Sequence, residues 1–327
     1  MMSTPNQILL SYNIGKVKNV DPINVGLIHQ TYQVDADKGN FILQRLHPNL
    51  ASDQIGEDFL AVTKALKEAG LPAPRAVLNR AGKVLTRDDA HAWRMQTFIK
   101  GKTIDKVANK KQAKEAGRIY AEFHKALSSL DYSFKSPIKL HRTRTEFAKL
   151  MLAIQDADRE LVVPVSDQIR FIAHELPALY LPDSLPRRVI HGDPKISNIL
   201  FDDDDNAVAT IDLDTCNHHT ILVDLGDAFR SWCGGDEDDP QNKFNWDIYE
   251  AGLDGYIQGA GDMITASETI MVPQAVGCLT LELAARFLAD YFNDSYFGWD
   301  KDRYKSRREH NLARCRGQIA LYKNMQK

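Results

Sequence analysis

Residues 189–215 read VIHGDPKISNILFDDDDNAVATIDLDT, and no other stretch of the chain constrains its structure as strongly. The segments SNILF and AVATIDLD have the composition of short strands, and DDDDN between them has the composition of a turn. The stretch therefore predicts a β-hairpin. In that hairpin Asp193, Asn198 and Asp212 lie at the ends of the strands rather than on their faces.

The same three side chains carry oxygen atoms that suit phosphate chemistry. Transfer of a phosphoryl group from ATP needs Mg²⁺ held by a carboxylate and an amide oxygen, and another carboxylate near the attacking hydroxyl. Asp193, Asn198 and Asp212 offer such oxygens in one short stretch. His-Gly-Asp alone is a weak signal, but the full set, with a hairpin inside it and strands earlier in the chain, favours ATP-dependent phosphoryl transfer.

The bulk composition narrows the range of partners. The chain has 327 residues, 43% of them hydrophobic and 26% charged, which is enough for two lobes with substantial cores. A formal net charge of -3 gives no general attraction to nucleic acid or to an anionic membrane, so we expect a small-molecule partner and no obligatory protein partner. The N-terminus lacks a signal-peptide pattern and no apolar run approaches the length of a bilayer span, so we expect a cytoplasmic protein.

The pattern of elements changes near Lys100. Before it, strand-like segments predict a β-rich lobe over residues 1–100, with one helix that Ser52 can cap and in which Glu57 lies early. After Gly101, apolar residues at helical spacing predict a mainly helical lobe over residues 101–327. The predicted strands of the first lobe are 16–23, 31–36, 41–46, 75–79, 83–87 and 94–99, and the predicted helices of the chain are 52–70, 109–130, 147–154, 165–179, 244–256 and 273–292.

With these motifs in this order, the chain resembles the aminoglycoside phosphotransferase and choline kinase superfamily, relatives of the protein kinases, over its whole length. The resemblance implies an α+β, protein-kinase-like two-lobed fold, with a small, mainly β N-terminal lobe, a hinge and a larger helical lobe. It also implies that Asp193 orients and deprotonates the acceptor hydroxyl, and that Asn198 and Asp212 bind Mg²⁺. Asp224 resembles the family's structural aspartate, which steadies the catalytic loop from the start of a helix.

The resemblance places the phosphates of ATP against the N-terminal lobe. The segment NVGLIHQTYQV takes the place of the phosphate-covering hairpin, in which Gly26 lets the backbone approach phosphate. In the third strand, FILQRL has Gln44 or Arg45 where kinase-like proteins usually carry a lysine. Arg45 can contact phosphate with Glu57 as its partner. Strand alternation directs either Gln44 or Arg45 away from the cleft, and the sequence leaves open which one.

The hinge is expected in QTFIKG, residues 96–101. By the resemblance, backbone groups of this segment, including those of Gln96 and Phe98, bind the edge of the adenine ring. The expected cofactors are therefore ATP and Mg²⁺.

The C-terminal third narrows the resemblance. LELAARFLADYFNDSYF and EHNLARCRGQIALYKNM are similar to segments of the N-acetylhexosamine 1-kinases, which phosphorylate the anomeric hydroxyl of N-acetylglucosamine or N-acetylgalactosamine. The resemblance implies that Arg286 and Tyr296 hold the sugar while Asp193 meets its 1-hydroxyl, although the spacing from Arg286 to Tyr296 departs by one residue. His29 stands where these relatives carry asparagine and is a further candidate ligand. The alternative for Arg286 is a pair with Asp290, one helical turn further on.

Three functions remain open. The leading one is an ATP-dependent kinase that makes a sugar 1-phosphate. The second is a kinase for a cationic acceptor, an amino alcohol or an aminoglycoside, whose ammonium groups would be attracted by acidic loops such as 236–239. The third is a catalytically silent binding module, which the missing lysine favours and the intact Asp193, Asn198 and Asp212 oppose. The acidic runs 202–205 and 236–239 are otherwise expected to be solvated turns.

Overall fold

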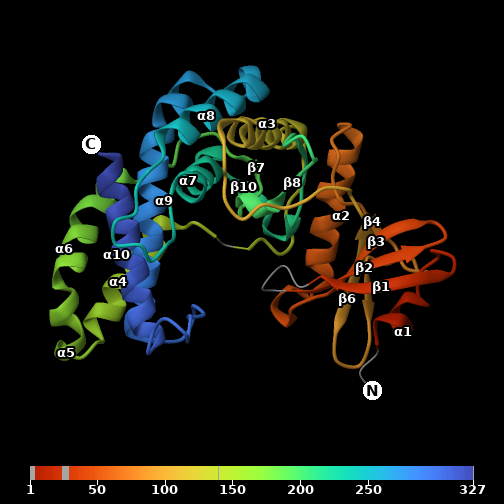
Figure 1. Cartoon of the computed structure of the whole chain (residues 1–327), viewed down its shortest axis with the longest axis horizontal. Helices are drawn as coiled ribbons and strands as arrows, with labels where there is room; N and C mark the ends of the chain where they lie inside the picture. The colour runs from red at the N-terminus through yellow and green to blue at the C-terminus, as the bar shows by residue number, and fades with distance from the viewer. Residues whose placement is uncertain (1–3, 24–28, 139, 327) are drawn as a thin grey trace.

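Two lobes lie side by side in the computed structural model, which describes residues 4–23, 29–138 and 140–326 (Figure 1). The N-terminal lobe is built on an antiparallel sheet in the order β1-β2-β3-β6-β4, in which β5 also pairs with β6. Its elements are α1 (Pro5–Leu9), β1 (Val17–Ile23), β2 (Gln30–Ala36), β3 (Gly39–Arg45), α2 (Asp53–Glu68), β4 (Ala76–Val77), β5 (Leu85–Arg87) and β6 (Ala92–Thr97).

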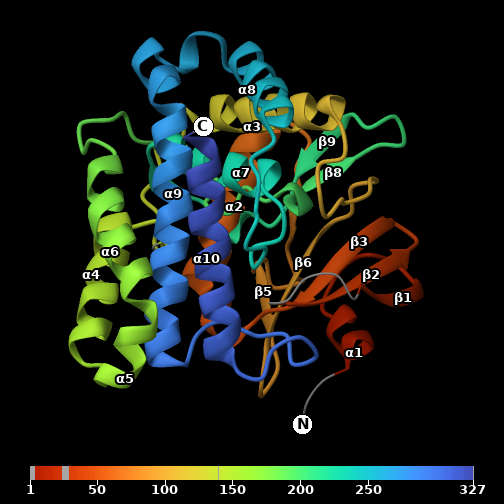
Figure 2. The same ribbon diagram turned by 60° about the vertical axis from the view of Figure 1, so that its left-hand side comes forward.

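The C-terminal lobe is mainly helical. Helices α3 and α7 lie beside the short strand pairs β7–β10 and β8–β9, whereas α4, α5 and α6 stand on the far side of α9 and α10 (Figures 1 and 2). Its elements are α3 (Lys110–Leu127), α4 (Thr143–Gln155), α5 (Arg159–Val162), α6 (Ser166–Glu175), β7 (Arg188–Ile190), β8 (Ile199–Phe201), β9 (Ala207–Thr210), β10 (Asn217–His219), α7 (Ile221–Cys233), α8 (Trp246–Ala260), α9 (Ala266–Asn293) and α10 (Arg307–Met325).

The two faces of β3 have different surroundings. Phe41 and Leu43 are buried in a core that also contains Trp93 of β6 and residues of α1. Because side chains alternate along a strand, Arg45 shares the direction of these core residues, and Gln44 points to the opposite face. Gln44 is therefore the residue of the pair that faces the C-terminal lobe.

Helix α2 packs against the C-terminal lobe. Ser52 caps the helix through its side chain, as expected from the sequence. The buried residues Phe59 and Val62 of α2 belong to the same hydrophobic cluster as Phe123 of α3 and Leu213, which follows the predicted metal ligand Asp212. A helix of the N-terminal lobe thus rests directly on the loop that carries Asp212.

The connection between the lobes is short. Strand β6 ends at Thr97, and at Lys102 the chain already pairs with Phe201 of β8 through two backbone hydrogen bonds of 2.8 Å. Gly101 lies so close to β8 that an added Cβ would be 2.9 Å from the Leu200 Cβ. The hinge is therefore held directly against the strand that follows Asn198.

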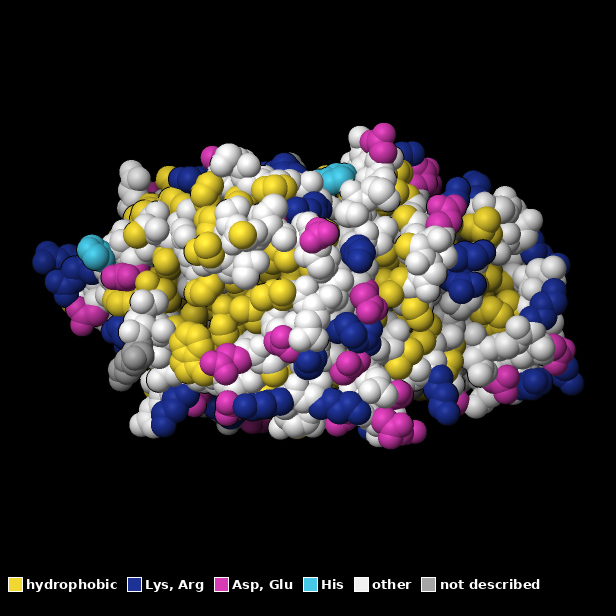
Figure 3. Space-filling view, turned by 90° about the horizontal axis from the view of Figure 1, so that it is seen from above, with side chains coloured by type: hydrophobic (Ala, Val, Ile, Leu, Met, Phe, Trp, Pro, Cys, Tyr) yellow, Lys and Arg dark blue, Asp and Glu magenta, His cyan; other side chains and the backbone are white. Residues whose placement is uncertain are grey.

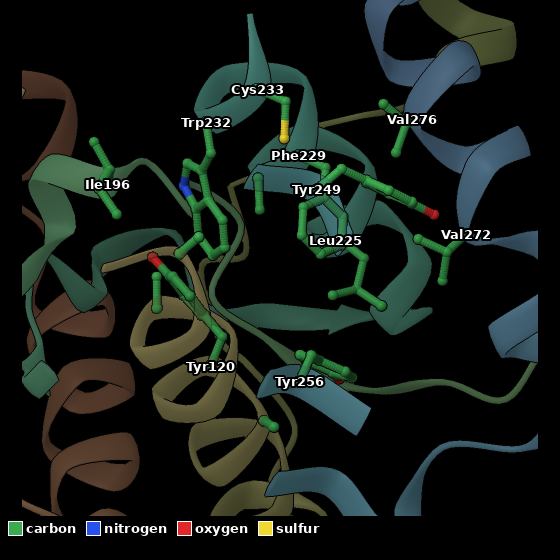
Figure 4. Packing of buried hydrophobic residues seen from close by; sticks show 14 of the residues in the cluster. Tyr120, Ile196, Leu225, Phe229, Trp232, Cys233, Tyr249, Tyr256, Val272 and Val276 are labelled. Atoms are coloured by element: carbon green, nitrogen blue, oxygen red, sulfur yellow. The ribbon is translucent and has the colours of Figure 1, made fainter. Parts of the chain in front are cut away.

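The main core of the C-terminal lobe lies behind the loop that carries Asp193. In Figure 4, aromatic side chains of α3, α7 and α8 meet there, among them Tyr120, Phe229, Trp232 and Tyr256. The Trp232 indole Nε1 donates a hydrogen bond of 3.0 Å to the Pro194 carbonyl oxygen. The core therefore holds the backbone one residue beyond Asp193.

Helix α9 forms the centre of the larger lobe. Contrary to the sequence-based expectation, it is long and apolar enough to span a membrane by length and composition, but 72% of the apolar window is buried inside the protein. It packs against α4, α7 and α10. Burial against these helices accounts for its apolar composition without a bilayer.

The α+β fold class with a mainly β first lobe and a helical remainder is confirmed. One local prediction holds only in part, because three residues of the acidic run 236–239 are exposed in a turn but Asp238 is not. Asp238 is buried, and its carboxylate accepts a hydrogen bond from the Tyr304 hydroxyl at 2.6 Å and forms an ion pair with Arg303 at 3.0 Å. The C-terminal segment that supplies these two donors is far away in sequence, and the charge pattern alone did not reveal it.

Candidate active site

The loop that carries Asp193 requires a glycine at position 192. Gly192 has a φ of +84°, and an added Cβ would lie only 2.5 Å from the Thr215 carbonyl oxygen. The Asp193 side chain is 21% exposed, so a ligand can reach it, and it accepts a hydrogen bond of 2.9 Å from Lys195. Burial lowers the pKa of Lys195, but the charge of Asp193 and its hydrogen bond, together with the charges of Asp227 and Asp212, raise the pKa overall. Lys195 therefore stays charged beside Asp193.

Asp224 braces this loop from the first turn of α7, as expected from the sequence. Its buried carboxylate accepts hydrogen bonds from the backbone N–H groups of His191, at 2.7 Å, and Gly192, at 2.9 Å. The His124 ring Nε2 lies 2.9 Å from the same carboxylate. The His191 ring contacts the Ile211 carbonyl oxygen at 2.9 Å, which ties the Asp193 loop to the Asp212 loop.

Asn198 and Asp212 lie at the same end of the β8–β9 hairpin. The Ile211 backbone N–H donates to the Asn198 carbonyl oxygen at 2.9 Å, so Ile211 lies opposite Asn198 and Asp212 is the next residue along the chain. The Asn198 amide nitrogen donates to the Asp193 carbonyl oxygen at 2.8 Å, which leaves the amide oxygen turned away as a possible metal ligand. Enclosure by the protein, followed by the charges of Asp214 and Asp193, raises the pKa of Asp212. A divalent cation would relieve this crowding of negative charge.

The Asp214 carboxylate is not free to bind that cation, because it already forms an ion pair. Arg94 of β6 binds both carboxylate oxygens of Asp214, and the two side chains are 1% and 2% exposed. Burial alone would raise the pKa of Asp214, but Arg94 and the hydrogen bond from His29 lower it strongly. His29, Asp212 and Asp214 bring potential metal-binding atoms within 4.8 Å of one another, and of these three Asp212 is the carboxylate left for a metal.

The predicted phosphate-binding pair of Arg45 and Glu57 is not formed. The Arg45 side chain lies on the same face of β3 as the core residues, and Glu57 is paired with Lys135 of the C-terminal lobe. Gln44 occupies the cleft side instead and accepts a hydrogen bond of 2.8 Å from Arg94, which lies directly opposite it on β6. The positive charge beside Gln44, where a lysine was expected, is therefore that of Arg94, which belongs to β6 and not to β3.

Four other predicted residues also need comment. His29 does not line the cavity that contains Arg286 and Tyr296. Its ring Nε2 lies 3.2 Å from Asp214, and its Nδ1 accepts a hydrogen bond from the His47 backbone N–H at 3.1 Å. The Phe98 N–H donates to the Asn40 carbonyl oxygen at 3.1 Å, so it is not available to adenine, and Gln96 lies inside β6 between two neighbouring strands. Gly26 lies outside the described residues.

The cavity that contains Arg286 and Tyr296 lies between α4 and the end of α9. It has a volume of about 290 Å³ and is lined by Leu140, His141, Glu146, Lys149, Arg286, Ala289, Asp290, Asn293, Ser295, Tyr296 and Phe297. The alternative pair of Arg286 and Asp290 is not formed. The Asp290 carboxylate instead accepts the backbone N–H groups of residues 295–297 and the Asn311 side chain.

A buried charge network at this cavity contains His141, Glu282 and Asp227, and sequence reasoning missed it. His141 contacts Glu282 at 3.2 Å and lies 3.8 Å from Asp227, whose charge also acts on Lys195. Burial lowers the pKa of His141, but the hydrogen bond with Glu282 and the charge of Asp227 raise it to about 9. The sequence signal was Asp227 in DLGDAFR, three residues after Asp224, but nothing in the sequence connected it to the distant His141.

These features define a two-lobed small-molecule kinase, and comparison with known proteins agrees. The structure resembles an aminoglycoside phosphotransferase from Alicyclobacillus acidocaldarius, with a TM-score of 0.71 and 13% identity over 100% of this chain and 96% of that one. It also resembles amicoumacin kinase solved with AMP-PNP and Ca²⁺, with a TM-score of 0.65 and 16% identity over 96% and 91% of the two chains. The protein-kinase-like fold expected from the sequence is confirmed.

Residues 19–256 match the model of the phosphotransferase enzyme family, and the chain belongs to that family. A relative by sequence is the homoserine kinase of Methylobacillus flagellatus, which is 25% identical over 227 residues, covering 69% of this chain and 67% of the relative. The catalytic class is therefore a phosphotransferase acting on a small-molecule acceptor.

Proposed function

We propose that the enzyme transfers the γ-phosphoryl group of ATP to the anomeric hydroxyl of an N-acetylhexosamine or a related sugar. The observation that carries this proposal is the state of Arg286. In the part of the chain that the structure describes, its guanidinium makes no ion pair or hydrogen bond, and it lies in the cavity wall 5.6 Å from the centre of the Phe297 ring. A guanidinium with free donors in the wall of a cavity is suited to bind oxygen atoms of an acceptor.

The reaction follows from the groups around Asp193. The Asp193 carboxylate accepts the proton of the acceptor hydroxyl as the hydroxyl oxygen forms a bond to the γ-phosphorus, and the bond from that phosphorus to the β–γ bridging oxygen breaks to release ADP. Lys195 places a positive charge beside the same reacting atoms. Asn198 and Asp212 would hold Mg²⁺, which neutralises phosphate charge when bound.

A neutral, oxygen-rich acceptor fits the cavity better than a cationic one. Arg286 and the protonated His141 contribute positive charge, and Asp290 has no oxygen left for an ammonium group because its hydrogen bonds are taken. The acidic loop 236–239, which was expected to attract a cationic acceptor, is neutralised by the chain's own side chains, including Lys106 and Arg303. Tyr296 is 71% exposed and offers a flat apolar face for a sugar ring.

The volume of the cavity supports the same choice. Small-molecule sites typically measure about 300–1,000 Å³, and the cavity of about 290 Å³ lies just below that range. It suits one sugar ring and is small for an antibiotic with several rings.

A second candidate is homoserine, because the curated relatives are named homoserine kinases. In that case Arg286 would bind the acceptor's carboxylate, and Glu146 of the cavity wall, which also pairs with Lys149 at 2.8 Å, would be a carboxylate for its ammonium group. The cavity chemistry thus allows an amino acid that carries an anionic group.

An ATP-consumption assay with N-acetylglucosamine, N-acetylgalactosamine, homoserine, choline and kanamycin tests the proposal. We expect turnover with the N-acetylhexosamines and none with choline or kanamycin. Arg286→Ala should raise the acceptor KM and leave the ATP KM unchanged, whereas Arg170→Ala, on the exposed surface of α6, should change neither. Turnover of homoserine alone would reject the sugar and establish the second candidate.

A further inference from the structure

Arg94 connects the two lobes at one buried point. From β6 its guanidinium binds both oxygens of Asp214, with the Nη2 to Oδ2 distance at 2.8 Å, and the same Nη2 donates to Gln44 Oε1 at 2.8 Å. The guanidinium carbon also lies 3.9 Å from the centre of the Phe59 ring on α2. Arg94 is 1% exposed, so it cannot be a direct ligand of ATP in this arrangement.

Asp214 is in turn joined to several parts of the N-terminal lobe. Its carboxylate forms an ion pair with Arg94 of β6. The ring Nε2 of His29, which precedes β2, lies 3.2 Å from the same carboxylate. The neighbouring residue Leu213 is buried in the cluster of Phe59 on α2. The short loop from Asp212 to Thr215 is therefore fixed from the N-terminal lobe, although it belongs to the C-terminal lobe.

The backbone of Asp212 needs such support. It has a φ of +61° and a ψ of +58°, the left-handed conformation that side-chain-bearing residues rarely adopt. Such a conformation persists only where surrounding contacts enforce it. Two contacts hold the backbone on either side of Asp212. The His191 ring contacts the carbonyl oxygen of the preceding residue, Ile211. Arg94 forms an ion pair with Asp214, which follows in the chain.

We propose that Arg94 is a positioning residue for the metal ligand Asp212. By holding Asp214 it fixes the left-handed turn and the direction of the Asp212 carboxylate, and it aligns the sheet with the catalytic loop. Arg94 thereby forms an ion pair within the active cleft. Strand β3 cannot form that pair, because it lacks the lysine that kinase-like proteins usually carry there. This inference rests on the proposed function only in taking Asp212 as a metal ligand.

The test uses the whole protein, with ADP present and Mn²⁺ as the probe, and needs no acceptor. Removing one partner of a buried ion pair destabilises a protein, because the other charge stays buried without a partner. The informative variant is therefore the double substitution Arg94→Gln with Asp214→Asn, which removes both charges and keeps groups that can form a hydrogen bond. Mn²⁺ affinity is measured by electron paramagnetic resonance, and the melting temperature by calorimetry.

The exposed pair Arg87 and Asp53 provides a matched control in the same lobe. Its atoms are 2.9 Å apart, as in a normal ion pair, but its side chains are 48% and 74% exposed. The control double substitution is Arg87→Gln with Asp53→Asn, and it should leave both the Mn²⁺ affinity and the melting temperature unchanged.

We expect the Arg94→Gln, Asp214→Asn protein to regain most of the melting temperature lost by Arg94→Gln alone, yet to bind Mn²⁺ about 10- to 100-fold more weakly than wild type, the usual effect of losing a residue that orients a metal ligand. Arg94→Lys, which keeps the charge but loses the two-pronged contact, should show a smaller loss in the same direction. Wild-type Mn²⁺ affinity in the double variant would overturn the inference.

Asp212→Asn separates this inference from the proposed function. If Asp212→Asn weakens Mn²⁺ binding while the Arg94 and Asp214 double variant does not, the metal site stands and the positioning role of Arg94 fails. If Asp212→Asn has no effect on Mn²⁺ binding, the metal assignment of the proposed function fails and the role of Arg94 fails with it.

Discussion

The side-chain neighbours of Asp193 both contact the same carboxylate oxygen, Oδ2. Its carboxylate contacts Lys195 and Asn198, and the backbone before it is held by Asp224. We predict that Asp193→Asn lowers kcat about 100-fold or more, because general-base catalysis contributes at least that much. ADP binding, measured by calorimetry, should be unchanged because Asp193 is not a nucleotide contact.

Asp204→Asn serves as the control for Asp193→Asn. Asp204 is an exposed carboxylate in the turn of the β8–β9 hairpin, and its loss should leave kcat unchanged. A kcat for Asp193→Asn within threefold of wild type would remove Asp193 from the catalytic role.

His141 gives the protein a pH-dependent stability. Its pKa is about 9 in the folded protein, where Glu282 and Asp227 face it together with Arg286, and about 6.5 in an unfolded chain. A raised histidine pKa adds stability that is complete below about pH 6.5 and is lost as the pH rises through 9. We predict that urea unfolding at pH 6 and pH 9.5 gives a loss of up to roughly 3 kcal/mol from this group.

His141→Gln should remove most of that pH dependence, and His174→Gln, whose side chain is 83% exposed, should retain it. The same slope in His141→Gln and in wild type would show that other groups cause the pH dependence.

At the scale of residues, the sequence revealed what lies close together along the chain. Asp193, Asn198 and Asp212 were identifiable because a single hairpin carries them. Arg94 and His141 were missed because their partners Asp214 and Glu282 are more than a hundred residues away. Arg45 was preferred for its charge, and only the pairing of β3 with its neighbours shows that Gln44 faces the cleft.

At the scale of elements, the buried carboxylate of Asp58 helps to hold α2 against the C-terminal lobe. Asp58 accepts hydrogen bonds from the Tyr132 hydroxyl at 2.8 Å and from the backbone N–H groups of Lys135 and Ser136, each at 2.9 Å. Asp58 is 8% exposed, so water cannot easily replace it as the acceptor. These hydrogen bonds therefore hold the segment that follows α3 against α2.

We predict that Asp58→Ala lowers the free energy of unfolding by about 2–3 kcal/mol, because it leaves enclosed donors without an acceptor. Glu57→Gln should cost less than about 1 kcal/mol, since its ion pair with Lys135 is half exposed. Urea unfolding of both variants measures this difference. Equal effects of the two substitutions would mean that Asp58 does not anchor the helix.

Most of the elements could be predicted because their apolar residues follow a regular period. The predicted helix 52–70 corresponds to α2 and the predicted helix 109–130 to α3, and the predicted strand 41–46 corresponds to β3. Helix α10 was missed as an element because polar and charged residues cover much of it, and it is held in place by packing against α9.

At the scale of the whole molecule, the order of a β-rich segment followed by helices was sufficient to predict two lobes. The contact between the lobes was not predictable, because it depends on Arg94 and Asp58, which look like ordinary charged residues in the sequence. Only some of the residues that line the proposed acceptor cavity could be predicted. Arg286 and Tyr296 line it, whereas His141 enters from a distant loop and His29 lies elsewhere.

The central claim is that the acceptor hydroxyl at Asp193 is the anomeric hydroxyl of a sugar held by Arg286. The most direct test is to identify the product of wild-type enzyme, ATP and N-acetylglucosamine by phosphorus–proton correlation NMR. We predict that the new phosphorus signal couples to the anomeric proton, and that 1-deoxy-N-acetylglucosamine gives no phosphorylated product. Coupling to the protons at carbon 6, or phosphorylation of the 1-deoxy sugar, would contradict the claim.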